Sequence, residues 1–334
     1  MPDYPCCLHQ NEADGSGIGD NDRHCALHSH YIAILTNAMK TTPRPIDATA
    51  LAIMLVLCTI WGGQQVAVKL AVPVVPAVLQ AGLRSMVATV LVGGWMLWRR
   101  QKLMTGDGTL PAGILAGVLF SLEFLCIFVG LTHTTASRMA VFLYTAPCFT
   151  AIGLHWTVPS ERLRTMQWLG MAIAFCGIVV AFSDGSGSDL ATTWPGDLLG
   201  ILAGLFWGLT TVVVRASRLA TAAPSKTLLY QLAVSAVLLC ALALVTGNVH
   251  IAPMTTTTWV SLVYQSIGVA FASYLIWFWL LTHYSAARLA SFSFLSPLFG
   301  VTFGVLILGE SVGWRFGCAV VLVFAGISLV NRRR

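Results

Sequence analysis

The chain repeats part of its own sequence inside strongly apolar segments. The seventeen residues from Leu131 to Pro147 recur 150 positions later, from Leu281 to Pro297, and eight of the seventeen are identical. A second pair of matching segments, offset by 146 positions, relates Trp61-Gly62 to Trp207-Gly208. An internal duplication in such apolar sequence indicates a membrane bundle built from two copies of one structural unit.

Composition excludes a water-soluble domain. Hydrophobic residues make up 57% of the chain and charged residues only 10%, against about 25% charged in soluble proteins. The net charge of +6 would suggest an acidic partner in a soluble protein. Here the basic residues stand between apolar runs, so we interpret them as determinants of membrane topology. We expect no nucleic-acid partner, because no basic patch is interleaved with aromatic residues.

The chain divides into a polar start and a long apolar remainder. Residues 1–46 are rich in Asp, Asn, His and Gly, and we expect a disordered extension there. The remainder predicts an all-α membrane protein with ten transmembrane helices of about 20 residues each. We place these helices near 48–69, 74–97, 111–131, 138–157, 167–183, 196–216, 227–246, 258–281, 286–308 and 313–331.

The ten helices form two repeats of five. We assign the first repeat to residues 47–183, a linker to 184–195 and the second repeat to 196–331. Prolines support these divisions, since proline interrupts or opens helices. Pro73 and Pro76 separate the first two helices, Pro111 opens the third, and Pro195 is expected in the linker.

The distribution of basic residues orients the bundle. If the helices alternate in direction, most Lys and Arg fall on one side, and by the positive-inside rule both termini are cytoplasmic. An odd number of helices in each repeat then inserts the second repeat in the opposite direction, which gives two inverted repeats. Only three basic residues outside the helix interiors are left on the other side: Lys69, Arg138 and Arg315.

These features resemble the ten-helix EamA-type members of the drug/metabolite transporter superfamily. The resemblance covers residues 47 to 331. It implies a transporter of the inner (plasma) membrane that moves a small organic metabolite, with amino acids, sugars and drugs among the solutes of the superfamily. In the first repeat, the residues that show the resemblance are Trp61-Gly62-Gly63, Lys69, Arg84, Ala136-Ser137, Pro147, Glu161 and Gly170. In the second repeat they are Gly196-Asp197, Trp207, Arg215, Ala286-Ala287, Pro297 and Gly309-Glu310. The first repeat departs from the pattern of Gly309-Glu310 with Pro159-Ser160-Glu161, so we expect an irregular turn there.

Glu123 is the acidic residue that we place deep inside a predicted helix. An ionised carboxylate at that depth costs several kcal/mol, so its side chain should face the interior of the bundle. Desolvation favours the proton-bound form, which makes Glu123 the candidate for proton coupling. The alternative is a protonated Glu123 that only forms a hydrogen bond to a neighbouring helix.

Aromatic and amide side chains supply the candidates for a solute cavity. Trp61 and Trp207 occupy equivalent positions in the two repeats, so they are candidates for two walls of one cavity, or for ordinary packing. Gln64 and Gln65 follow two glycines, and Gln65 is the candidate of the pair for the cavity; the alternative is that these amides join neighbouring helices. The resemblance adds further lining candidates, some of which would instead lie at helix interfaces or in the lipid belt. They are Tyr144, Tyr264, Gln265, Tyr274 and Trp277.

Pro147 and Pro297 lie at equivalent positions inside predicted helices and are candidates for hinges, or for static kinks. We expect no cofactor and no metal site. His24, Cys25, His28 and His30 have a possible ligand spacing, but a His-rich tail commonly matches such a spacing by accident.

The sequence therefore predicts a secondary transporter that exports a small organic solute by alternating access, with protons as a possible coupling ion. No phosphate-binding GxxxxGK[ST] motif is present, which argues against direct use of ATP. The alternatives are an intramembrane enzyme and a membrane scaffold that transports nothing. Against the enzyme, the chain has no HExxH or GxSxG motif and a single deeply placed carboxylate.

Overall fold

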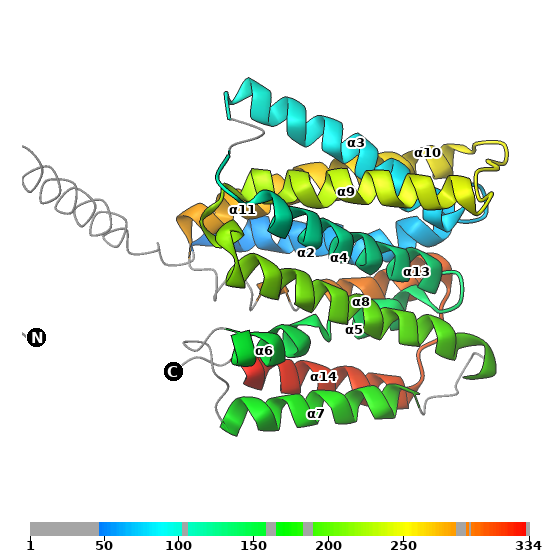
Figure 1. Ribbon diagram of the computed structural model, residues 1–334. Coiled ribbons are helices and arrows are strands. Elements are labelled where there is room, and N and C mark those ends of the chain that lie inside the picture. The colour runs from blue at the N-terminus through cyan, green and yellow to red at the C-terminus, as the bar shows by residue number, and fades with distance from the viewer. Residues whose placement is uncertain are drawn as a thin grey trace, which may run out of the picture. The chain divides into compact units, whose positions relative to one another are not determined.

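The computed structural model shows regular secondary structure that is helical in every range it describes. These ranges are residues 47–101, 106–157, 165–182, 190–284, 292–293 and 295–331. The helices belong to one compact unit that begins at Pro45, and most of them run alongside one another (Figure 1). They are α2 (Ala48–Ala71), α3 (Ala77–Trp98), α4 (Leu110–Gly130), α5 (Ala136–Leu143), α6 (Ala146–Thr157), α7 (Thr165–Phe182), α8 (Leu190–Ala216), η2 (Arg218–Thr221), α9 (Pro224–Val245), α10 (Thr256–Val263), η3 (Tyr264–Ser273), α11 (Tyr274–His283), α13 (Leu295–Leu308) and α14 (Trp314–Asn331).

Seven helical segments of the described residues, each 21–24 residues long, are long and apolar enough to cross a membrane. Two shorter apolar helices, Leu295–Leu308 and Trp314–Gly326, accompany them. The prediction that the chain forms apolar helices long enough to cross a membrane is therefore confirmed, while the number of ten such helices stays a prediction.

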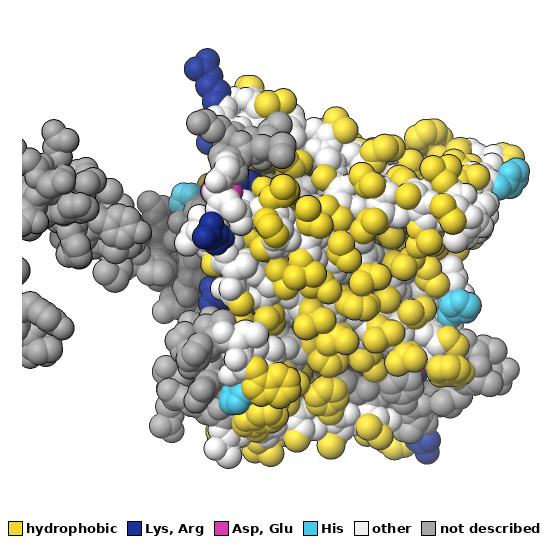
Figure 2. Space-filling model, in the orientation of Figure 1, with side chains coloured by type: hydrophobic (Ala, Val, Ile, Leu, Met, Phe, Trp, Pro, Cys, Tyr) yellow, Lys and Arg dark blue, Asp and Glu magenta, His cyan; other side chains and the backbone are white. Residues whose placement is uncertain are grey.

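The outer surface of the bundle is apolar. Figure 2 shows hydrophobic side chains over the middle of one face and Lys and Arg side chains gathered mainly at one end. Large apolar residues such as Val90, Val179 and Leu306 are 69–74% exposed, as expected for side chains that contact lipid. This surface is that of a protein that crosses the membrane several times.

Helices at equivalent places in the two predicted repeats pack against each other. The second helix of each repeat is α3 or α9, and these two pack together; the fifth is α7 or α14, and these two pack together. Small residues allow the second contact: a Cβ atom on Gly326 would lie 2.4 Å from the Gly170 carbonyl oxygen and the Ala174 nitrogen.

The predicted helix 138–157 is divided into α5 and α6. Pro147 has no amide hydrogen to donate to the Leu143 carbonyl oxygen four residues earlier, and α5 ends at Leu143. The amide of Thr145 instead donates to Phe142, with a distance of 3.1 Å, in a tight turn. Tyr144 and Thr145 are therefore a two-residue junction between two helices.

The predicted helix 258–281 is continuous but not uniformly α-helical. It consists of α10, the π-helix η3 and α11. π-helical hydrogen bonds join residues five apart instead of four, so the side chains of η3 point in directions that an α-helical pattern does not predict.

The helix α8 begins at Leu190, which corrects our expectation that Pro195 lies in a loop. Pro195 is inside α8, near its beginning. As the sixth residue of α8, Pro195 removes one hydrogen bond, to the carbonyl oxygen four residues earlier, while the helix continues. The extra turns place Asp197 inside the helix with 0% exposure, and Asp197 is thus a second deeply buried carboxylate.

Some sequence predictions lie outside the described residues. These are the extension 1–46, the turn at Glu161, and the repeat positions Ala286, Ala287 and Arg288.

Candidate functional site

A cavity of about 640 Å³ lies in the middle of the bundle, within the size range of small-molecule sites. Its walls come from α2 and α4 in the first predicted repeat and from α8, α9 and α11 in the second, together with the α5–α6 junction. Six of the eight predicted lining residues are in these walls, namely Trp61, Gln65, Tyr144, Trp207, Tyr274 and Trp277. The proton-coupling candidate Glu123 and the hinge candidate Pro147 also line the cavity.

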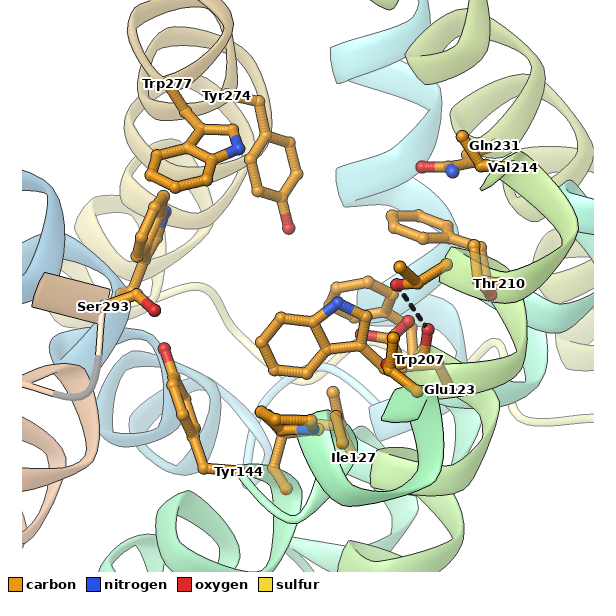
Figure 3. Close-up of a pocket in the computed structure, with 18 of the residues that line it drawn as sticks. Glu123, Ile127, Tyr144, Trp207, Thr210, Val214, Gln231, Tyr274, Trp277 and Ser293 are labelled. Atoms are coloured by element: carbon orange, nitrogen blue, oxygen red, sulfur yellow. Dashed lines mark hydrogen bonds between the residues drawn. The ribbon is translucent and has the colours of Figure 1, made fainter. Parts of the chain in front are cut away.

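The two repeated tryptophans each make an edge-to-face contact with another aromatic lining residue. The ring centroids of Trp61 and Trp277 are 5.5 Å apart at an interplanar angle of 74°. Those of Tyr144 and Trp207 are 5.4 Å apart at 90°. Figure 3 shows Trp277 and Tyr274 on one side of the cavity, Trp207 with Glu123 across from them, and Tyr144 on a third side.

Glycines next to the tryptophans allow the neighbouring backbone to come close. A Cβ atom on Gly62 would lie 2.6–2.8 Å from atoms of α13. A Cβ atom on Gly204 would lie 2.6 Å from the Thr145 hydroxyl and 3.0 Å from the Leu143 carbonyl oxygen. Bare backbone at these positions therefore holds α2 against α13, and α8 against the α5–α6 junction.

Glu123 lies in the cavity wall with 6% exposure. Within the described part of the chain, no hydrogen bond or ion pair joins its carboxylate to another helix. This placement differs from the alternative in which Glu123 only bonds a neighbouring helix.

Several polar lining residues were not anticipated from the sequence. Thr210 and Thr211 follow Trp207 by three and four residues, and Gln231 follows Thr227 by four, so each set shares a helix face. This spacing, which puts the threonines on the same helix face as the predicted lining residue Trp207, could have identified them as lining residues. The other such polar residues are Thr150, Gln167, Arg215 and Ser293. Gln64, the partner of Gln65 in the sequence, also lines the cavity.

Tyr264, Gln265 and Pro297 are outside the lining of this cavity. The Tyr264 hydroxyl donates to the Ile60 carbonyl oxygen at 2.7 Å, and Gln265 is fully buried. Both residues were lining candidates from the family resemblance, and both lie in the π-helix η3. Pro297 lies in the first turn of the described α13, whereas Pro147 lies at the α5–α6 junction.

The cavity reaches one end of the bundle, which we call the cavity end. Gln167 is the third residue of α7, Arg215 the penultimate residue of α8 and Thr227 the fourth residue of α9, and all three line the cavity. These helix termini lie together on the left of Figure 1, where Lys and Arg gather in Figure 2.

Hydrogen bonds and ion pairs join the helices at the opposite end, which we call the cross-linked end. The Glu310 carboxylate accepts hydrogen bonds from the amides of Ala136 (2.6 Å) and Ser137 (2.9 Å) and from the Ser137 hydroxyl (2.7 Å). Lys69 lies 3.7 Å from Glu310 and donates to the Thr134 carbonyl oxygen at 2.8 Å. Glu310 thus caps the beginning of α5 and holds α2 and α13 near it.

A glycine turn puts Glu310 in this position. Gly309 has φ = 67° and its amide donates to the Val305 carbonyl oxygen at 3.2 Å, which is the αL ending of a helix. The amide of Glu310 also donates to the Gly304 carbonyl oxygen at 3.2 Å. The missing side chain of Gly304 leaves room for the Glu310 carboxylate and the Ser137 hydroxyl.

Arg138 and Asp197 form a buried ion pair at the same end. The Arg138 Nε donates to both Asp197 oxygens at 3.0 Å, and its Nη2 also contacts the carboxylate. The Thr134 hydroxyl donates to Asp197 at 2.6 Å. This pair ties α5 to α8, so α5 is connected to three other parts of the bundle.

We predict that Trp277→Ala weakens solute binding by about tenfold or more, because it removes one wall of the cavity and the edge-to-face partner of Trp61. Affinity is measured from solute-dependent tryptophan fluorescence. Trp279→Ala is the matched control, since Trp279 lies on the same helix, is 45% exposed and is outside the cavity lining. Equal affinities for the two variants would assign Trp277 to packing.

Known families and proteins match nearly all of the helical part of the chain. Two stretches, residues 48–183 and 194–332, each match the model of the EamA-like transporter family. A crystal structure superposes with a TM-score of 0.59 over 85% of this chain and 98% of the other, at 19% identity, which shows a shared fold.

Three curated relatives are transporters by name. An uncharacterized transporter of Archaeoglobus fulgidus is 25% identical over 82% of this chain and 94% of its own. A probable amino-acid metabolite efflux pump of Salmonella typhimurium is 26% identical over 82% of this chain and 91% of its own. An uncharacterized inner membrane transporter of Escherichia coli is 23% identical over 80% of this chain and 86% of its own.

Proposed function

The chain belongs to the EamA-like transporter family, and from this we propose that it exports a small organic solute of the amino-acid metabolite class across the inner membrane. The name of the Salmonella relative supports the solute class. Aromatic walls with a few amide, hydroxyl and carboxylate groups suit a solute that has both an apolar part and charged groups.

The observation that carries the proposal is one cavity with walls from both repeats that extends toward one end of the bundle. Trp61 and Trp207, at equivalent repeat positions, both line it. The cavity reaches the cavity end, while hydrogen bonds around Glu310 and Asp197 hold the opposite end together. This is the arrangement expected of one state in an alternating-access cycle.

We further propose ten membrane helices in two inverted repeats, with both termini and the cavity end in the cytoplasm. The gathering of Lys and Arg at the cavity end supports this orientation. The positive-inside rule placed Lys69, Arg138 and Arg315 on the side opposite the cytoplasm. Two of these charges are neutralised at the cross-linked end, since Lys69 pairs with Glu310 and Arg138 pairs with Asp197. The packing of α3 on α9 and of α7 on α14 supports the inverted relation.

Glu123 supplies the proton coupling in this proposal. It faces the cavity from the low-dielectric middle of the bundle, where a carboxylate changes its protonation state with the charge of its surroundings. A proton entering from outside and the solute entering from the cytoplasm would then use the same cavity in turn.

The test is transport by the purified protein in liposomes that carry a pH gradient. Uptake of isotope-labelled amino acids is followed by mass spectrometry, and proton movement by a pH-sensitive dye inside the liposomes. We expect Glu123→Gln to keep solute exchange without a gradient and to lose its acceleration by the gradient. Glu123→Asp, which keeps a carboxyl group, should retain part of that acceleration. The same gradient dependence in Glu123→Gln as in the unmodified protein would remove Glu123 from the coupling.

A further inference from the structure

A buried arginine lies directly behind the cavity wall. Arg84, on α3, is 1% exposed. Its Nε donates to the Gln265 carbonyl oxygen at 3.3 Å. Its two terminal nitrogens, Nη1 and Nη2, have no hydrogen-bond partner in the described part of the chain. The Tyr274 hydroxyl interacts with the guanidinium without a hydrogen bond of standard length. A buried guanidinium whose terminal donors are so weakly satisfied is costly, and its retention calls for an explanation by function.

Two buried amides accompany Arg84. Gln80 precedes it by four residues, which puts both side chains on one face of α3, and Gln80 is 0% exposed. Gln265, whose carbonyl group contacts Arg84, is also 0% exposed. Neither side-chain amide has a hydrogen-bond partner among the described residues. The protein thus buries a guanidinium and two amides with free donors within one region.

This cluster shares a wall with the cavity. The Arg84 Cζ atom lies 4.1 Å from the centroid of the Phe124 ring. Glu123 and Tyr274 both interact electrostatically with the guanidinium. Phe124, Glu123 and Tyr274 all line the cavity, so Arg84 is one layer behind them. Arg84 is seven residues, roughly 10 Å, from the beginning of α3, on the side of the cavity toward the cross-linked end.

The pair Arg84 and Glu123 differs from the structural ion pair in the same molecule. Arg138 and Asp197 are in direct contact through several hydrogen bonds. Among the described residues, no hydrogen bond or ion pair joins Arg84 to Glu123, although each is buried. The charges of Arg84 and Glu123 are therefore not satisfied by direct contact with each other, unlike those of Arg138 and Asp197.

We infer that Arg84, with Gln80 and Gln265, is a carboxylate-binding subsite, and that the transported solute is a zwitterion whose ammonium group contacts Glu123. This inference rests on the proposed transport function. When Glu123 is ionised, the charges of Arg84 and Glu123 sum to zero, so a net-neutral solute with opposite charged ends leaves no charge unbalanced in the low-dielectric interior. A solute with only an anionic or only a cationic group would leave one of the two side chains uncompensated.

The experiment compares three forms of one solute in the liposome assay. A pool of isotope-labelled L-amino acids identifies the fastest substrate. That amino acid is then compared with its amino alcohol, which lacks the carboxylate, and with its deaminated acid, which lacks the ammonium group. We expect the unmodified protein to move the amino acid at least about tenfold faster than either analogue. We expect Arg84→Gln to lose this preference over the amino alcohol, and Arg84→Lys to retain part of it.

Gln80→Leu keeps the inference testable if Arg84→Gln fails to fold. Replacing an unpartnered buried amide with leucine should leave thermal stability unchanged or raised, and should weaken binding of the amino acid measured by tryptophan fluorescence. Equal transport rates for the amino alcohol and the amino acid, with the same rates in Arg84→Gln, would overturn the subsite. That result would leave the proposed transport function standing. No movement of any amino acid in the pool would overturn both. Unweakened binding in a stable Gln80→Leu would also overturn the subsite.

Discussion

Replacing Arg138 with alanine is expected to lower the free energy of unfolding by about 3–5 kcal/mol, because it leaves the buried Asp197 carboxylate without its counter-ion. The Asp197 side chain is 1% exposed, so water cannot replace the lost contacts. Arg138 also lies over the rings of Phe142 and Phe316, each at 5.6 Å, and this packing is lost with it. The measurement is denaturant-induced unfolding of the protein in detergent micelles.

A double substitution separates the charge from the packing. Arg138→Leu together with Asp197→Leu should recover most of the loss, since replacing both members of a buried ion pair removes the unpaired charge. Arg218→Ala is the control for loss of an arginine, because Arg218 is exposed and makes one long contact of 3.4 Å with the Asp107 carbonyl oxygen. A loss below about 1 kcal/mol in Arg138→Ala would mean that the pair is accessible to water.

Replacing Glu310 with alanine is expected to loosen the cross-linked end. The substitution removes three charge-assisted hydrogen bonds to Ala136 and Ser137 and the partner of Lys69. Such bonds are each worth about 1.5–3 kcal/mol, and 1.4 kcal/mol corresponds to a tenfold change in a local equilibrium. We therefore expect the amides of the first turn of α5 to exchange with deuterium at least about tenfold faster, as measured by mass spectrometry.

The first turn of α9 provides the internal control for that experiment. The amides of Lys226 and Thr227 lie at the cavity end and donate to the Ala223 carbonyl oxygen, away from Glu310. Their exchange should be unchanged in Glu310→Ala. Unchanged exchange at Ala136 and Ser137 would show that Glu310 does not hold the cross-linked end together.

Local signals in the sequence were sufficient to predict much of the cavity. Trp61 and Trp207 were identified because the chain is duplicated, and Glu123 because a carboxylate in an apolar helix is costly. Tyr144, Tyr274 and Trp277 came from the family resemblance, and all line the cavity. Each of these signals can be read from the sequence without knowing which helices are in contact.

The cross-linked end depends on contacts that no single segment displays. Ser137 and Glu310 are 173 residues apart, and Arg138 and Asp197 are 59 apart, so nothing local indicates that they meet. Likewise, residue types alone do not reveal that Tyr264–Ser273 is π-helical, and Tyr264 and Gln265, which lie in this helix, are outside the cavity lining. Pro195 was misplaced because a proline near a helix start leaves the same pattern as one in a loop.

The two-residue junction at Tyr144 and Thr145 has a consequence for inhibition. On one side, α5 is anchored by Glu310 and Asp197; on the other, α6 and Tyr144 border the cavity. The junction therefore connects the anchored helix α5 to the part of the cavity wall that would contact the solute. A rigid compound that binds against Tyr144 would restrict the movement of α5 and α6 relative to each other. Such a compound would inhibit the protein without resembling the solute that it carries.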